Sequence, residues 1–187
     1  VMLGQEKFKH LKIYIIPGNH DPAIARGVFT LPNIQFLLEP ELINLCEETS
    51  FFFLPYRTAT TQGEILAAYQ EDLKQKPWVL VAHGDFSAST SLRNDYEDGY
   101  YMPLSGRDIQ VYHPEKVFLG HIHAPFDSDH LHYPGSPCGL DITETGIRSF
   151  LIYDTSTNLV TRQPIQTSVI YFQETLTVLP LEDEVSY

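Results

Sequence analysis

Lys116-Val-Phe-Leu-Gly-His-Ile-His123 is a short apolar run that stops abruptly at a glycine and two histidines. Its continuous run of β-branched, aromatic and aliphatic residues predicts a buried strand over Lys116–Leu119. Trp78–Ala82 (WVLVA) has the same character and leads directly into His83-Gly84. Both segments therefore predict buried strands that deliver histidines at their carboxyl ends.

A third apolar run, Leu11–Pro17 (LKIYIIP), ends in the tetrapeptide Gly18-Asn19-His20-Asp21. Its β-branched residues, followed by a Pro-Gly-Asn break, predict a strand that enters a tight loop. Side chains at the carboxyl ends of neighbouring strands in an α/β sheet converge on one crevice. We therefore expect the polar residues that follow the three strands to lie together, although they are far apart in the sequence.

The remaining pattern predicts an α/β fold in which stacked β-sheets are flanked by helices. Apolar residues at helical spacing predict one helix over Gln62–Gln75, which Pro77 stops. The segment Asp85–Arg107 has no clear period and is interpreted as a long loop. Further strands are expected at Ile34–Leu38, Ser50–Leu54, Leu131–Tyr133, Arg148–Tyr153 and Val169–Phe172.

The composition fits one globular domain of 187 residues with a net charge of −12. No apolar stretch reaches transmembrane length, and the first residues do not resemble a secretory signal, so the expected location is the cytoplasm, with no membrane partner. Two cysteines are too few for a disulfide framework or a zinc–thiolate site. The acidic net charge argues against a basic DNA-binding surface, so a polyanion would have to be held locally, by metal ions or by a partner.

Asn19, His20, His83, His121 and His123 could lie together, and imidazole nitrogen and amide oxygen bind manganese, iron or zinc. Two such ions about 3.5–4 Å apart can hold a phosphate for in-line attack. A histidine that binds no metal can then protonate the leaving oxygen. Each motif alone has a simpler interpretation, such as a turn for Gly-Asn-His-Asp. Their order, each after a predicted buried strand, favours a metal site.

The three motifs resemble, in order, the last three motifs of the calcineurin-like metallophosphoesterases. The resemblance implies two divalent metal ions, with manganese expected first and iron or zinc as alternatives. It implies that Asn19, His83 and His121 are ligands of the second metal and that His123 is a ligand of the first. It also implies that His20 contacts the phosphate and protonates the leaving group.

Residues after the last motif narrow the resemblance to DNA repair exonucleases of the SbcD type. They include Ala124-Pro125, the turn Tyr133-Pro134-Gly135-Ser136-Pro137 and the acidic stretch Asp141–Thr145. Pro55-Tyr56-Arg57, before the predicted helix, is also similar to that branch. The resemblance covers residues 11–172 and implies a metal-dependent enzyme that cleaves DNA ends, with an SbcC-type ATPase subunit as its partner.

The chain departs from the family pattern upstream of Gly18, where no Asp-x-His and no Gly-Asp is found. We therefore expect an N-terminally truncated catalytic domain over residues 1–172 that lacks its first strands. Residues 173–187 would be a tail or the start of a missing capping region. The first metal would keep only His123 as a ligand, which would impair the fragment as an enzyme. Exposed sheet edges would favour self-association, for example as a homodimer.

Three functions compete at this point. The first is a phosphodiesterase, exonuclease or endonuclease, that acts on DNA ends. The second is a general phosphodiesterase or phosphatase of the same fold that acts on small-molecule phosphate esters, which the acidic charge favours. The third is a degenerate, non-catalytic scaffold, supported only by the missing aspartates. Hydrolysis of linear duplex DNA compared with bis-p-nitrophenyl phosphate would separate the first two.

Overall fold

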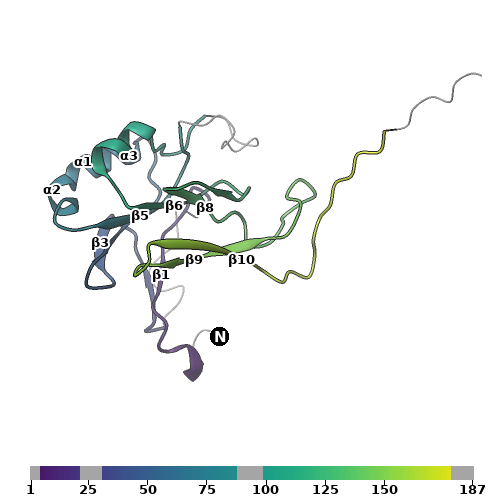
Figure 1. Ribbon diagram of the computed structural model, residues 1–187, viewed down its shortest axis with the longest axis horizontal. Helices are drawn as coiled ribbons and strands as arrows, with labels where there is room; N and C mark the ends of the chain where they lie inside the picture. Colours follow the sequence, from purple (N-terminus) through teal and green to yellow (C-terminus); the bar gives the residue numbers. More distant parts are fainter. Residues whose placement is uncertain (1–4, 22–30, 88–98, 178–187) are drawn as a thin grey trace, which may run out of the picture.

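The computed structural model describes residues 5–21, 31–87 and 99–177, and its centre is a six-stranded sheet (Figure 1). The strand order is β3-β4-β5-β6-β8-β7. These strands are β3 (Glu41–Asn44), β4 (Ser50–Leu54), β5 (Trp78–His83), β6 (Lys116–Gly120), β7 (Phe126–Asp127) and β8 (Leu131–Tyr133). Strands β4, β5, β6 and β8 run parallel, whereas β3 and β7 pair antiparallel at the two edges. The described chain is therefore α/β with a mixed sheet, which confirms the predicted fold class at this level.

One face of this sheet packs against helices and forms the main core. Side chains alternate along each strand, so every second residue of the central strands points to this face. Phe52, Leu80, Val117 and Leu119 are each at most 1% exposed and belong to one apolar cluster. Their burial on a single face fixes the register of the parallel strands, because a slip of one residue would expose all of them.

Three short helices cover that face: α1 (Gln62–Ala68), α2 (Gln70–Leu73) and α3 (Gly106–Tyr112) (Figure 1). Thr61 is the N-cap of α1 and Ser105 is the N-cap of α3. Each forms a reciprocal capping box with the acidic residue three positions later. Among the described residues, none of the helices is long and apolar enough to span a bilayer. A short 3₁₀ turn, Glu6–Phe8, precedes the first strand.

Two small sheets lie against the opposite face of the six-stranded sheet. In one of them β1 (Ile13–Ile15) pairs in parallel with β2 (Ile34–Phe36), and in the other β9 (Ser149–Asp154) forms an antiparallel hairpin with β10 (Leu159–Pro164). Tyr14 stacks on Phe53 with 5.4 Å between ring centroids. Tyr153 contacts Phe118 with a centroid separation of 5.5 Å. The aromatic side chains therefore join the sheets in layers.

The strands that the sequence predicts are present except for the last one. Ser50–Leu54 and Leu131–Tyr133 have the predicted bounds. The predicted strand at Val169–Phe172 is wrong, because only Tyr171 forms an isolated bridge, to Thr145. Val169 and Phe172 are 54% and 71% exposed, so no apolar surface covers them.

One predicted helix and one predicted loop also need correction. The predicted helix over Gln62–Gln75 is divided at Tyr69, whose φ of −105° and ψ of 9° end α1. The Tyr69 ring packs on Phe52 and its hydroxyl donates to the Pro40 carbonyl at 3.3 Å, which ties this point to the neighbouring strands. The segment interpreted as a loop over Asp85–Arg107 contains the start of α3, and its residues 88–98 lie outside the described part of the chain.

Candidate metal centre

The three motifs meet around the imidazole of His83, the last residue of β5. A Cβ atom at Gly18 would lie 2.6 Å from the His83 ring, and one at Gly120 would lie 2.8 Å from its Nδ1 atom. Neither position can therefore carry a side chain without displacing the ring. Glycine at both positions lets two backbones approach His83 closely. The three segments thus converge as predicted, but β1 belongs to a separate two-stranded sheet, so Gly18 reaches His83 from another sheet and not from a neighbouring strand.

Asn19 and His83 direct polar atoms at one another within this arrangement. Asn19 Oδ1 lies 2.7 Å from His83 Nε2. The His83 and His121 rings are in edge contact, with 5.4 Å between their centroids. Two ligands that share one ion in neighbouring coordination positions, each at 2.0–2.1 Å, lie about 3 Å apart. An amide oxygen and two imidazoles are suitable ligands for one divalent ion of intermediate hardness.

The buried carboxylate of Asp85 lies beside the His121 ring. Its Nε2 atom lies 3.5 Å from Asp85 Oδ1, and both side chains are 2% exposed. Asp85 Oδ2 accepts a hydrogen bond from the Tyr101 backbone N–H at 2.6 Å, whereas Oδ1 accepts none from the described residues. The contact between Oδ1 and Nε2 is not a hydrogen bond in this structure. A shift of a few tenths of an ångström would let the carboxylate accept from Nε2–H, which would fix the tautomer and leave Nδ1 as the ligand atom of His121.

The backbone at His121 is strained, with a φ of +96°. A non-glycine residue in this region costs about 1–3 kcal/mol and is common at functional sites. Tyr133 supports the adjoining loop by donating a hydrogen bond to the Gly84 carbonyl at 2.9 Å. Burial raises the pKa of Tyr133, and the Asp85 charge raises it further, so its hydroxyl remains a donor.

Tyrosine rings line the same region. The Tyr101 ring lies 5.2 Å from the His121 ring, measured between centroids, and Tyr56 lies 6.2 Å from His83 in an edge-on arrangement. Tyr56 and Tyr101 are themselves 6.3 Å apart. The candidate site is therefore bounded by aromatic side chains from the segment after β4 and from the segment before α3.

His123 does not join the other predicted ligands and pairs instead with Glu144. Its Nδ1 atom lies 2.6 Å from Glu144 Oε1, and its side chain is 47% exposed. The second carboxylate oxygen, Oε2, accepts hydrogen bonds from Ser136 Oγ at 2.5 Å and from the Leu140 N–H at 3.3 Å. A carboxylate only accepts, so Nδ1 of His123 carries a hydrogen, and in a neutral imidazole the lone pair is then on Nε2.

Hydrogen bonds stabilise the negative charge of Glu144. Burial alone would raise the pKa of this carboxyl, but the hydrogen bonds from Ser136, His123 and the Leu140 N–H, together with the charge of His123, keep the pKa below its usual value. Glu144 is therefore ionised at neutral pH. An outer carboxylate bonded to one ring nitrogen is the arrangement that orients metal-binding histidines in proteins.

Arg148 fixes the backbone of the same loop. Its side chain is buried, and it donates to the carbonyl oxygens of His123 at 2.7 Å, Ser136 at 3.2 Å and Thr145 at 3.4 Å. One guanidinium thus connects the histidine motif to the turn and to the acidic stretch after it. These contacts determine the position of the His123 main chain independently of its side chain.

His20, the predicted proton donor, is exposed on the turn that the Asp21 N–H closes onto the Gly18 carbonyl at 3.2 Å. It follows Asn19 directly, which brings it beside the candidate ligands. No group of three or more His, Cys, Asp or Glu residues suited to a metal occurs in residues 5–21, 31–87 and 99–177. Among these described residues, Asn19, His83 and His121 are the candidate ligands that lie together, and one of the three is an asparagine.

Sequence reasoning did not identify the supporting residues Asp85, Tyr101, Glu144 and Arg148. Asp85 directly follows His83-Gly84, so its place after the strand could have marked it. Glu144 belongs to an acidic stretch that the resemblance includes, but no spacing rule connects it to His123. Tyr101 and Arg148 have no local signal, because their contacts depend on the tertiary fold.

Comparison with protein-family models and with curated proteins finds no match for this chain. The resemblance therefore depends on the three motifs themselves, and any activity is a matter for proposal and test.

Proposed function

We propose that the chain is a metal-dependent phosphodiesterase of the calcineurin-like metallophosphoesterase type that acts on DNA ends, as SbcD-type nucleases do. The observation that carries the proposal is the meeting of three separate motifs on His83. The ring is in close contact with Gly18 and Gly120, is bonded to Asn19 at 2.7 Å and touches the His121 ring. A turn or a surface histidine would not require glycines on both sides of one imidazole.

Asn19, His83 and His121 would hold one divalent ion, with manganese proposed first. When bound, such an ion polarises a phosphate oxygen and neutralises developing negative charge. His20 would donate a proton to the leaving oxygen, since it is exposed and adjoins Asn19. His123 is assigned to the other ion, the first metal of the family pattern, by resemblance only. Its Nε2 atom is the nitrogen that the Glu144 contact leaves for a ligand.

A second candidate substrate class is supported by the charge of the chain. A net charge of −12 disfavours long-range attraction of DNA, so a small phosphodiester or phosphomonoester is the alternative substrate. An SbcC-type ATPase and a second copy of the chain remain proposed partners. A partner with a basic surface would supply the long-range attraction of DNA that the acidic charge of this chain disfavours.

The test is hydrolysis of linear duplex DNA and of bis-p-nitrophenyl phosphate in the presence of manganese. We expect turnover that a chelator abolishes. His83→Ala should lose both metal binding and turnover, whereas His20→Ala should keep metal binding and lose about 10²–10⁴-fold in turnover. Metal binding without hydrolysis of either substrate would favour the non-catalytic scaffold. Equal behaviour of the two variants would contradict the roles given to these histidines.

A further inference from the structure

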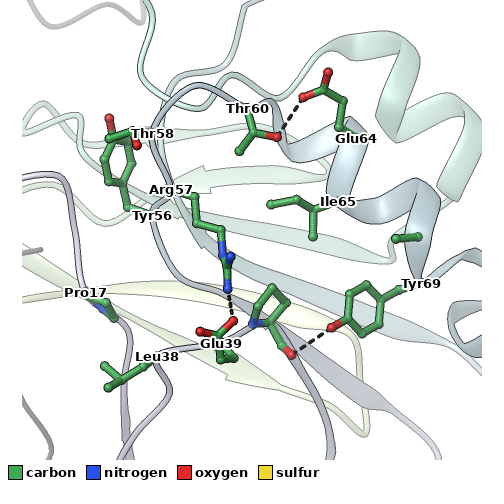
Figure 2. Close-up of a pocket in the computed structure, with 12 residues that line it drawn as sticks. Pro17, Leu38, Glu39, Tyr56, Arg57, Thr58, Thr60, Glu64, Ile65 and Tyr69 are labelled. Atoms are coloured by element: carbon green, nitrogen blue, oxygen red, sulfur yellow. Dashed lines mark hydrogen bonds and ion pairs between the residues drawn. The ribbon is translucent and has the colours of Figure 1, made fainter.

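A groove of about 820 Å³ lies along helix α1, and Figure 2 shows the residues that line it. Its lining includes Pro17, which directly precedes Gly18, and Tyr56, whose ring faces His83. The groove therefore begins beside the candidate metal ligands. Its volume is within the range of small-molecule and cofactor sites. The function proposed above assigns nothing to it.

The two ends of the groove are aromatic and the middle carries charge. Tyr56, whose ring is near His83, lies at one end, and Tyr69 lies at the other beside Ile65 (Figure 2). The Tyr69 hydroxyl donates to the Pro40 carbonyl. Between them Arg57 crosses from one wall to pair with Glu39 on the opposite wall (Figure 2). An arginine between aromatic and apolar walls is a suitable site for a phosphate that carries a base.

The Arg57–Glu39 pair is held weakly enough to exchange. The side chains are 40% and 74% exposed, and an ion pair of that exposure contributes no more than about fivefold to an equilibrium. The Nε atom of Arg57 is buried and has no hydrogen-bond partner among the described residues. That buried atom does not face a ligand in the groove, but the Nη groups of a partly exposed guanidinium can bind a bidentate anion, and phosphate oxygens match their geometry.

The second acidic residue of the groove is already engaged. Glu64 accepts hydrogen bonds from the Thr61 N–H at 2.9 Å and from Thr60 Oγ1 at 2.8 Å as part of the cap of α1. It is therefore held at the helix start and does not compete for Arg57. Of the two carboxylates among the described residues that line the groove, only that of Glu39 pairs with the Arg57 guanidinium.

We propose that this groove binds the nucleotide next to the scissile phosphodiester. The flanking phosphate replaces Glu39 on Arg57, and its base packs in the apolar end beside Ile65 and Tyr69. The inference rests on the proposed function for the position of the scissile phosphate, and it adds a substrate class: a diester with a nucleotide on at least one side. Glu39 acts as a competitor that excludes ligands without a phosphate at this position.

The test measures binding without hydrolysis. A fluorescein-labelled trithymidylate with phosphorothioate linkages is titrated with the full chain in a chelator at about 0.15 M salt, where exposed charges are well screened. Arg57→Gln should weaken binding about tenfold or more, because a charge-assisted contact is lost. Glu39→Gln should tighten binding by about three- to fivefold, because the competitor is removed. Glu48 is exposed and lies outside the groove, so Glu48→Gln makes the same charge change as a control. It should alter binding by less than about twofold.

Equal effects of Glu39→Gln and Glu48→Gln would show a net-charge effect only and would overturn the proposal. An Arg57→Gln variant that binds the trinucleotide as tightly as the native chain would also overturn the proposal. An abasic trinucleotide that binds as well as the thymidine form, or inorganic phosphate that competes equally well, would overturn the base-binding part.

Hydrolysis of bis-p-nitrophenyl phosphate, measured separately with manganese, distinguishes the two failures. Retained hydrolysis without the expected binding pattern rejects the groove alone. The expected binding pattern without any hydrolysis rejects the phosphodiesterase activity and supports the groove as a nucleotide site.

Discussion

Asp85→Asn tests the buried carboxylate behind His121. The substitution keeps the size of the side chain but replaces one oxygen acceptor by an NH₂ donor. The Tyr101 N–H, which donates to Asp85 Oδ2 at 2.6 Å, requires the remaining oxygen. The NH₂ group would then face His121 Nε2, where the carboxylate oxygen lies at 3.5 Å in the native chain. His121 would be driven to the tautomer that carries hydrogen on Nδ1, the atom expected to bind metal.

We expect Asp85→Asn to weaken manganese binding by about 10–100-fold, the usual effect of losing an outer carboxylate, which corresponds to about 1.4–2.7 kcal/mol. Calorimetric titration measures the affinity, and nitrogen NMR of the imidazoles reports the His121 tautomer. Asp129→Asn is the matched control, because Asp129 is exposed and lies outside the site. Unchanged affinity together with an unchanged tautomer would refute the role given to Asp85.

Three further predictions concern the loop around His123 and the nearby surface. Glu144→Gln offers one acceptor oxygen where the carboxylate serves three donors, so the His123 tautomer should become mixed in nitrogen NMR spectra. Arg148→Met leaves three backbone carbonyls without their donor and should cost about 3 kcal/mol in urea unfolding, with a cost below about 1 kcal/mol contradicting its structural role. Hydrogen bonds from Arg162, then from His132, lower the pKa of Asp127 from 3.8 despite partial burial. Asp127 therefore adds stability above about pH 4 that is lost as the pH falls through its lowered pKa. Asp127→Asn should unfold more easily than the native chain at pH 7, by under about 1 kcal/mol because the group is partly exposed, and the difference should close below pH 4.

The strands were predictable where burial on both faces made the apolar run continuous, as in Trp78–His83 and Lys116–Gly120. The hairpin partner Leu159–Pro164 was missed, because its strand has a polar, half-exposed pattern that gains its order only by pairing with β9. Helix α3 was missed because it is short and begins at Gly106, although Ser105 and Asp108 form its capping box.

The candidate site was predictable to the extent that residues at strand ends converge. His83 and His121 lie together, as expected, because the parallel strands β5 and β6 place their carboxyl ends at one edge of the sheet. Asn19 also lies beside His83, but it follows β1, which belongs to a separate sheet, so the rule for neighbouring strands does not explain its position. His123 follows His121 by two residues, yet its ring turns to Glu144. That choice depends on a carboxylate 21 residues away in sequence, which no local pattern specifies.

The most direct measurement is an anomalous diffraction map from a crystal of this chain grown with manganese. The account predicts a peak bonded to Asn19 Oδ1, His83 Nε2 and His121 Nδ1, and its loss in a His83→Ala crystal. A map with no peak at these atoms, or with manganese bound only at other histidines such as His10 or His113, would contradict the metal centre on which the proposed activity depends.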